Sequence, residues 1–177
     1  MKLLAIDPGT EQSGWCVFDG DVVASSGVMP NAEMLAYVGR RHFEINGHGL
    51  AIEMIASYGM PVGREVFETC LWIGRFIQAW RRPEAVQLIY RRDVKSHLCG
   101  TAKAKDANIR QALLDRFPRT GGGKTPQVGT KAAPGPLYGV STHAWAALAV
   151  AMLVTDKAAH AARTRTVSPP TYSPGII

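Results

Sequence analysis

Apolar and polar positions near the N-terminus follow the pattern of short strands joined by tight turns. Residues 3–6 are all apolar, and the run ends at Asp7, which a proline and a glycine follow. Two further β-prone runs, 13–18 and 21–28, are separated by an Asp-Gly pair, which is a strong short-range signal for a hairpin. The pattern therefore predicts three consecutive antiparallel strands at the start of the fold.

Later segments alternate between helical periodicity and short apolar runs. We expect, in order, a helix over 32–43 that ends near Gly47 and Gly49, a strand over 50–55, a helix over 64–82 stopped by Pro83, a strand over 86–90, a helical turn over 94–98, a helix over 106–117 and a final helix from 141 to about 155. Aromatic residues at 72, 76 and 80 share one helix face. Such a stripe is typical of a core or a subunit interface, and base stacking is the less favoured role.

Two segments lack apolar periodicity. Residues 118–140 are rich in Gly, Pro, Thr and Lys, which predicts a flexible basic loop. Residues 158–177 carry arginines and prolines and are expected to form a disordered tail, which leaves 1–157 as one domain. The Gly-Lys-Thr sequence at 123–125 is not a phosphate-binding P-loop, because the first glycine of that motif would fall at Pro118. We therefore expect no nucleotide cofactor.

The composition is that of one globular domain with an excess of positive charge. The chain has 177 residues and is 46% hydrophobic, enough for one substantial core. A net charge of +6 favours a polyanionic partner, and solubility is an equally good reason for it. The three cysteines form no closely spaced pair, which favours reduced thiols over a zinc site. With no signal peptide and no membrane-length apolar run visible, we expect a cytoplasmic protein without membrane contact.

Acidic residues interrupt two of the predicted strands. Asp7 lies at the open end of the first strand, and Glu53 lies within the strand over 50–55. A buried carboxylate needs a metal ion, a cation or hydrogen-bond donors beside it. Capping the turn that follows is an equally good interpretation of Asp7 taken alone. If the two strands are neighbours, facing carboxylates make sense chiefly with divalent cations between them.

A histidine and a series of basic residues complete the candidate chemistry. His143 opens the alanine-rich final helix, which can lie close to a sheet, although a single histidine is more often a surface or core residue. The basic residues are Arg91, Arg92, Lys95, Lys103, Lys105, Arg110, Lys124 and Lys131. Near a carboxylate–metal centre such a set suits a phosphodiester backbone, although each one alone is more often a solvated side chain.

Four segments, in this order, resemble the RuvC-type Holliday junction resolvases of the ribonuclease H-like superfamily. They are Ile-Asp-Pro-Gly-Thr at 6–10 with Gly14 after it, Ala-Ile-Glu at 51–53, the lysine-bearing segment 94–109, and the start of the final helix at 143–151. The resemblance runs from residue 1 to about 155. It is greatest to short phage-encoded versions, which implies a bacterial cell.

The resemblance implies an α/β fold of the ribonuclease H-like type, a mixed sheet with three antiparallel strands first, flanked by helices. It implies a homodimer in which each subunit cuts one strand of a branched DNA junction, using Mg²⁺ or Mn²⁺, two ions per site. Asp7, Glu53 and His143 match three of the four metal ligands of the family. The fourth falls on Ala146, so Asp106 is a candidate replacement, with helix capping as its alternative role. His143 could instead act as a general base or assist the leaving group.

The resemblance also assigns DNA contacts. Lys95 and Lys105 match lysines of the family and would contact phosphates of the strand that is cut. The nearby cations are candidates for further backbone contacts: Lys103, Arg110 and Lys124. Tyr58 lies two positions from the base-stacking aromatic of the family and would support an unpaired base at the branch point.

Two other functions remain open from the sequence. One is a ribonuclease H-like nuclease acting on RNA–DNA hybrids or on a broad range of branched DNA. The other is a non-catalytic junction-binding protein, which the alanine at position 146 favours.

Overall fold

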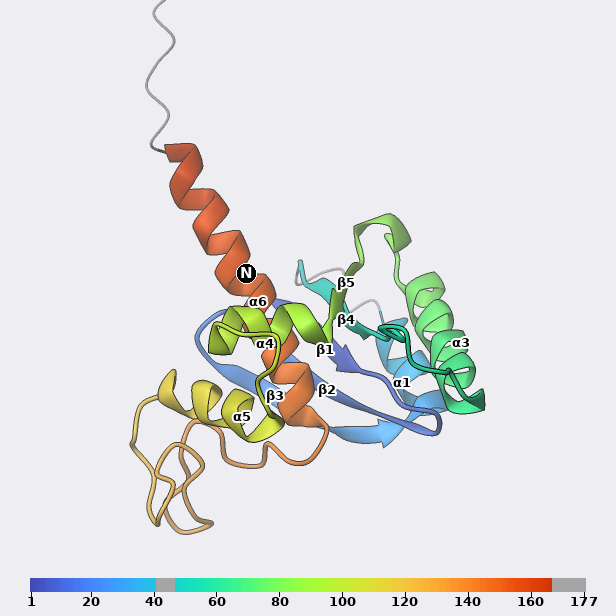
Figure 1. The fold of residues 1–177 in the computed structure, drawn as a ribbon. Coiled ribbons are helices and arrows are strands. Elements are labelled where there is room, and N and C mark those ends of the chain that lie inside the picture. Colours follow the sequence, from blue (N-terminus) through green and yellow to red (C-terminus); the bar gives the residue numbers. More distant parts are fainter. Residues whose placement is uncertain (41–46, 167–177) are drawn as a thin grey trace, which may run out of the picture.

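The computed structural model describes residues 1–40 and 47–166. It contains one mixed sheet of five strands, in the order β3-β2-β1-β4-β5 (Figure 1). The strands are β1 (Leu3–Asp7), β2 (Gln12–Phe18), β3 (Val23–Pro30), β4 (Gly49–Met54) and β5 (Gln87–Tyr90). The first three are antiparallel to one another, as predicted, whereas β4 and β5 run parallel to β1.

Helices cover both faces of the sheet (Figure 1). They are α1 (Asn31–Val38), α3 (Arg64–Ala79), the 3₁₀ turn η1 (Pro83–Ala85), α4 (Arg91–Cys99), α5 (Asp106–Asp115) and α6 (Ala144–Thr166). Alternate side chains of the strands form two apolar clusters, one packed against α1 and α3 and the other against α4, α5 and α6. The aromatic stripe of α3 belongs to the first cluster, with Phe76 and Trp80 buried and Trp72 packed beside them, so its predicted core role is confirmed.

Helix α6 lies directly on the sheet and continues beyond it. Its alanines at 144, 147, 149 and 151 are fully buried, and their small side chains let the helix approach β1 and β2 closely. The helix ends at Thr166 and extends away from the body of the molecule (Figure 1). The final helix was predicted to end near residue 155, with a disordered tail from residue 158. Both predictions are wrong for residues 158–166, which continue α6. Alanine has a high helix propensity, so an alanine-rich sequence can continue a helix that has no apolar face to bury. The rest of the predicted tail lies outside the described residues.

The helix predicted over 32–43 is shorter than expected. Helix α1 ends at Val38, and the backbone N–H of Gly39 bonds the carbonyl of Leu35 at its C-terminal end. The predicted end near Gly47 and Gly49 is wrong, since Gly49 already begins β4. Residues 41–46 lie outside the described part of the chain.

The segment 118–140 folds into successive hydrogen-bonded turns, unlike the flexible loop that its composition predicted. Backbone N–H groups of Gly121 and Leu137 donate to the carbonyls of Pro126 and Gln127, both at 2.8 Å. Leu137 is fully buried in the apolar cluster beneath α6. Turns satisfied by backbone bonds leave no apolar period in the sequence, which is why composition alone suggested a loop without structure.

Helices in the described ranges lack the length and apolar content that crossing a membrane requires.

Candidate active site

Strand register brings the two predicted carboxylates together. In the parallel pair β1–β4, Ile6 lies opposite Ile52, so the next residues, Asp7 and Glu53, are neighbours at the carboxyl ends of their strands. Side chains alternate along a strand. Asp7 follows Leu3 and Ala5 on the sheet face that α6 covers, and Glu53 follows Ala51 on the same face. The prediction that the two acids would face each other from adjacent strands is therefore consistent with the register.

Both carboxylates are mostly buried, and their pKa values shift accordingly. Burial raises the pKa of Asp7 above its ordinary value, and the charge of His143 offsets part of that rise. Burial, followed by the charge of Asp7, raises the pKa of Glu53 to about 7. Two carboxylates held this close favour protonation unless a cation lies beside them.

His143 is the residue immediately before α6, and its side chain contacts Asp7. Its Nδ1 lies 3.2 Å from Oδ2 of Asp7, and 61% of its side chain is exposed. Gly14, which pairs with Asp7 across β1 and β2, makes this approach possible. A Cβ atom on Gly14 would lie 2.6 Å from Cβ of His143 and closer still to its carbonyl group. The glycine of the predicted second strand is thus required by the position of the histidine.

Two strained residues border the site. Thr142, next to His143, has a φ of 35°, and Tyr58, in the loop after β4, has a φ of 48°. In the described chain these are the non-glycine residues with positive φ, a backbone region that is costly for a β-branched or bulky side chain. Such strain is commonly retained where a functional geometry requires it.

A buried asparagine fixes the turn that follows Asp7. The Asn31 side chain donates from Nδ2 to the carbonyl of Gly9 at 2.9 Å and accepts from the Ser13 hydroxyl at 2.6 Å. Its backbone N–H donates to the carbonyl of Glu11 at 2.9 Å. No local sequence pattern indicates this role, because a lone asparagine at a helix start is also typical of a simple cap.

Arg91, one of the basic residues expected near the site, pairs directly with two of its carboxylates, which no local sequence pattern indicates. It follows β5 directly, and its Nη1 is 3.5 Å from Glu53 Oε2 while its Nη2 donates to Asp106 Oδ1 at 2.7 Å. The bond from Arg91 lowers the pKa of Asp106.

Asp106 is the first residue of α5 and does not cap this helix. Lys105 occupies the cap position, and its backbone N–H donates to the Asn108 side chain at 2.9 Å. The alternative capping role of Asp106 is therefore wrong.

These side chains line one open cleft with a volume of about 580 Å³. Its lining includes Asp7, Glu53, Arg91, Asp106, His143 and Ala146. A smaller hollow of about 200 Å³ adjoins it, shared by Asp7, Glu53, Arg91 and Tyr58. The structure thus brings all four predicted metal ligands and the predicted stacking tyrosine to connected cavities.

The donor set fits a divalent cation at Asp7 and Glu53. Two neighbouring, buried carboxylates with raised pKa values are the oxygen ligands that a hard cation stabilises. Within residues 1–40 and 47–166, however, no three His, Cys, Asp or Glu side chains form a ready metal cluster. Asp106 is instead bonded to Arg91.

The predicted DNA-binding cations differ in their distance from the cleft. Among the Lys and Arg residues that the structure describes, Arg91 and Arg110 line the cleft, and the Arg110 guanidinium lies 4.2 Å from the centre of the Trp145 ring. Lys95 is near enough to Asp106 to lower its pKa after the larger effect of Arg91. Lys105 directly precedes Asp106 in the chain, and Lys103 is exposed two residues earlier. Lys124 is exposed in the 118–140 segment and does not line the cleft.

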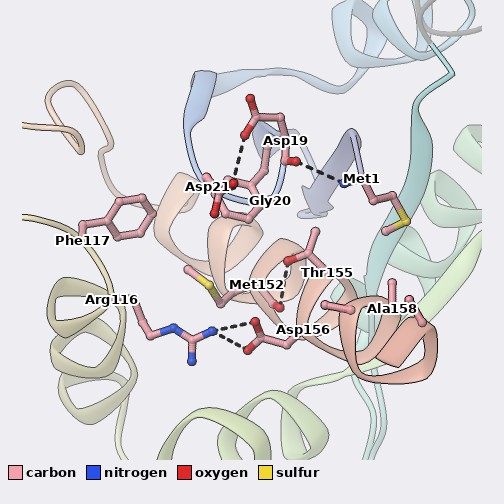
Figure 2. A pocket seen from close by; sticks show the side chains of 13 residues that line it. Met1, Asp19, Gly20, Asp21, Arg116, Phe117, Met152, Thr155, Asp156 and Ala158 are labelled. Carbon is pink, nitrogen blue, oxygen red and sulfur yellow. Dashed lines mark hydrogen bonds and ion pairs between the residues drawn. The ribbon is translucent and has the colours of Figure 1, made fainter. Parts of the chain in front are cut away.

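A second hollow, of about 550 Å³, lies where β1 begins and therefore at the other end of the sheet (Figure 2). Two of the acids that line it, Asp156 and Asp19, already have hydrogen-bond partners. Asp156 accepts two bonds from Nη2 of Arg116, at 2.6 and 2.7 Å, and Asp19 accepts from the backbone N–H groups of Val22 and Asp21. Figure 2 shows the Arg116–Asp156 pair, which joins the residue after α5 to α6, so this hollow is a structural junction between elements.

No protein-family model and no curated protein matches the sequence. Solved structures do match. The Thermus thermophilus RuvC structure has a TM-score of 0.62 and 19% identity, over 91% of this chain and 97% of that one. Thermus thermophilus RuvC in complex with a Holliday junction substrate has a TM-score of 0.59 and 20% identity, over 94% and 97%. This chain has the RuvC fold. The fold class predicted from the sequence, ribonuclease H-like, is confirmed.

Proposed function

We propose that this RuvC-fold chain is a structure-selective DNA endonuclease that cuts four-way junctions by metal-assisted hydrolysis of a phosphodiester bond. The observation that carries the proposal is the pair Asp7 and Glu53, side by side on parallel strands, with His143 bonded to Asp7 in an open cleft. One of the matching RuvC structures was solved with a Holliday junction substrate, which supports branched DNA as the substrate class.

Asp7 and Glu53 would hold the cation, which their oxygen donors suit to Mg²⁺ or Mn²⁺. Bound there, a divalent ion would stabilise charge on the phosphate and lower the pKa of a water nucleophile. The resemblance implied two ions. A second ion would need Asp106, but the carboxylate of Asp106 is already bonded to Arg91.

His143 is suited to handle the proton of the attacking water or of the leaving group. Asp7 accepts from Nδ1 in the tautomer that carries its proton there, which leaves Nε2 as an acceptor. The exposed ring can reach a water or a DNA oxygen in the cleft. The contact with Asp7 holds the imidazole orientation that this role requires.

The basic residues around the cleft would bind the DNA backbone. Arg110 lies in the cleft, and Lys95 and Lys105 lie beside its Asp106 wall, where they would neutralise phosphates near the bond that is cut. Lys103 and Lys124 would make contacts further along the DNA. Tyr58 is exposed and shares a hollow with both carboxylates, which supports its predicted role in stacking on an unpaired base.

Cleavage of a synthetic four-way junction in the presence of Mg²⁺ tests the proposal. Asp7→Asn and Glu53→Gln should each reduce cutting by at least about 100-fold, since each removes a negatively charged oxygen ligand. Both should leave junction binding largely intact at a stated salt concentration, because the phosphate contacts remain. Asp21→Asn, at an exposed acid near the opposite end of the sheet, is the matched control. Normal cutting by both site variants would show that the assignment is wrong.

Substrate range is tested by equal concentrations of four-way, three-way, flap and RNA–DNA hybrid substrates. A preference for the four-way junction supports the proposal, and equal cutting of all forms supports the broader ribonuclease H-like activity. Ala146 lines the cleft where the family has a fourth ligand, and this favours a second candidate, a non-catalytic junction-binding protein. Junction binding without cutting under any divalent metal or pH would establish that alternative.

We also propose that the protein acts as a homodimer formed through the outer face of α3. Phe67 and Leu71, one turn apart on this helix, are 63% and 57% exposed, although both are large and apolar. Gly74 continues the same face, and a side chain there would meet nothing within 4 Å. A second copy covering this stripe would bury it, and two subunits would supply two cleavage sites for the two strands of a junction.

A further inference from the structure

Arg91 contacts the acidic site more extensively than any other cation in the described chain. Its side chain is 28% exposed, and its two terminal nitrogens lie on Glu53 and Asp106. It lines both the main cleft and the smaller hollow. Asp7 also lies within its electrostatic range. One guanidinium therefore acts on all three carboxylates of the site.

The net charge of these groups determines how much additional positive charge the site can bind. When the three carboxylates Asp7, Glu53 and Asp106 are ionised, the guanidinium of Arg91 offsets one of their three negative charges. Two negative charges remain, which equals the charge of one divalent ion. A second divalent ion would have to enter beside a fixed guanidinium, and like charges at such short range repel strongly where burial limits screening.

Ligands for a second ion are also lacking on the side where Arg91 lies. Ala146 lines the cleft one helical turn after His143 and contributes only a methyl group. The near oxygen of Asp106 is bonded to Arg91 at 2.7 Å, although the side chain is otherwise 77% exposed. The arginine thus occupies the carboxylate that could have replaced the missing ligand.

We infer that the site binds a single divalent cation, at Asp7 and Glu53, and that the Arg91 guanidinium supplies the positive charge where a second cation would otherwise lie. This inference rests on the proposed nuclease function and deepens it. A guanidinium presents several N–H donors in a fixed plane, which matches the oxygens of a phosphodiester group. Because Arg91 lines both hollows of the site, it would be able to bind the reacting phosphate.

The number of bound ions is measured by titrating DNA-free protein with Mn²⁺ and recording the free-ion signal by electron paramagnetic resonance. We expect one ion per chain for the unaltered protein and for Arg91→Lys, which keeps the charge. Arg91→Ala should still bind one ion, with affinity higher by about tenfold, because a repelling charge has been removed. Arg92→Ala, at the exposed neighbouring arginine, is the matched control and should not change the affinity. Circular dichroism confirms that each variant is folded.

A double variant tests the exchange of arginine for a second ion. Ala146→Asp alone should remain at one ion, whereas Ala146→Asp combined with Arg91→Ala should bind two. Two ions in the unaltered protein, an unchanged affinity in Arg91→Ala, or one ion in the double variant would each overturn the inference.

Junction cleavage in parallel separates this inference from the proposed function. Cutting by a protein that binds two ions leaves the nuclease proposal standing and removes only the one-ion inference. Asp7→Asn should bind no ion over the Mn²⁺ range in which the unaltered protein becomes saturated. Failure of the unaltered protein both to bind an ion and to cut would remove the nuclease proposal, and the one-ion inference with it.

Discussion

At the scale of single residues, the site is defined by two acids, Asp7 and Glu53, that are mostly buried. Glu53 is the clearest case, since burial and the charge of Asp7 raise its pKa from 4.5 to about 7. Arg91 offsets only part of this effect. The cost of holding these carboxylates together is what makes the site receptive to a cation.

The raised pKa of Glu53 predicts how the stability of the metal-free protein depends on pH. The folded protein retains a proton on Glu53 that the unfolded chain releases above pH 4.5, so this stabilisation is fully present below pH 4.5 and is lost as pH rises to about 7. The loss should reach up to about 3 kcal/mol. Urea unfolding at pH 5 and pH 7.5 measures it as the difference between the unaltered protein and Glu53→Gln.

Glu33→Gln, at an exposed acid of α1, is the control for this measurement and should follow the unaltered protein. Addition of Mg²⁺ at pH 7.5 should restore stability to the unaltered protein more than to Glu53→Gln, because binding to the folded state stabilises it. Parallel pH profiles for the unaltered protein and Glu53→Gln would contradict the assigned cause.

Single-residue roles were predictable only where the local sequence implied them. Asp7 and Glu53 stood out because each interrupts an apolar strand. Arg91 was one of several cations in its region, and its partners Glu53 and Asp106 lie 38 and 15 residues away in the chain. Nothing in the local pattern shows which of these cations turns toward the carboxylates.

At the scale of secondary structure, the site depends on the close packing of α6 against β2. Gly14 and His143 meet there, and the backbone of the helix start touches the strand. The strained φ of Thr142 sets the direction in which the chain enters this contact.

This contact predicts the effect of Gly14→Ala. The added methyl group would push the start of α6 away from β2, with a loss of about 1–3 kcal/mol in stability. Junction cleavage should fall by about 100-fold or more, because His143 would move away from Asp7. Thermal melting and a cleavage assay on the same sample measure both effects. Gly63→Ala, where an added Cβ meets nothing within 4 Å, is the control, and similar losses in both variants would argue against the contact.

Element boundaries were predictable where turn residues mark them and not where tertiary packing decides them. The Asp19-Gly20 pair correctly predicted the β2–β3 hairpin. The predicted end of α6 was wrong because its last turns carry mostly exposed alanines and polar residues, which show no apolar periodicity from which a helix could be predicted. The 118–140 segment was also missed, since its order comes from backbone hydrogen bonds that many sequences could form.

At the scale of the whole molecule, two opposite surfaces follow from the fold. The carboxyl ends of β1, β4 and β5 open into the acidic cleft, while the outer face of α3 leaves an apolar stripe exposed. The proposed function places a nucleic acid and a metal ion at the first surface and a second copy of the chain at the second.

The exposed stripe predicts the oligomeric state. The unaltered protein should have twice the mass of one chain by light scattering after gel filtration at micromolar concentration. Leu71→Asp should be monomeric, because a charge at the centre of the stripe cannot be buried without a partner. Its melting temperature should change little, since Leu71 is exposed in the single chain. Val22→Asp, at an exposed apolar residue between β2 and β3, is the control and should remain dimeric. A monomeric unaltered protein would remove the dimer proposal.

The collision that any side chain at position 14 would have with residue 143 also limits how the sequence can diverge. Positions 14 and 143, which are 129 residues apart, therefore cannot change independently in evolution. A larger side chain at position 14 would push the start of α6 away from β2, and this shift would separate the His143 imidazole from Asp7. Homologous chains with low overall sequence identity to this one should therefore still have a glycine at the position of Gly14. They should also have a polar residue just before the alanine-rich start of the last helix. The coupling offers a way to recognise distant relatives from sequence.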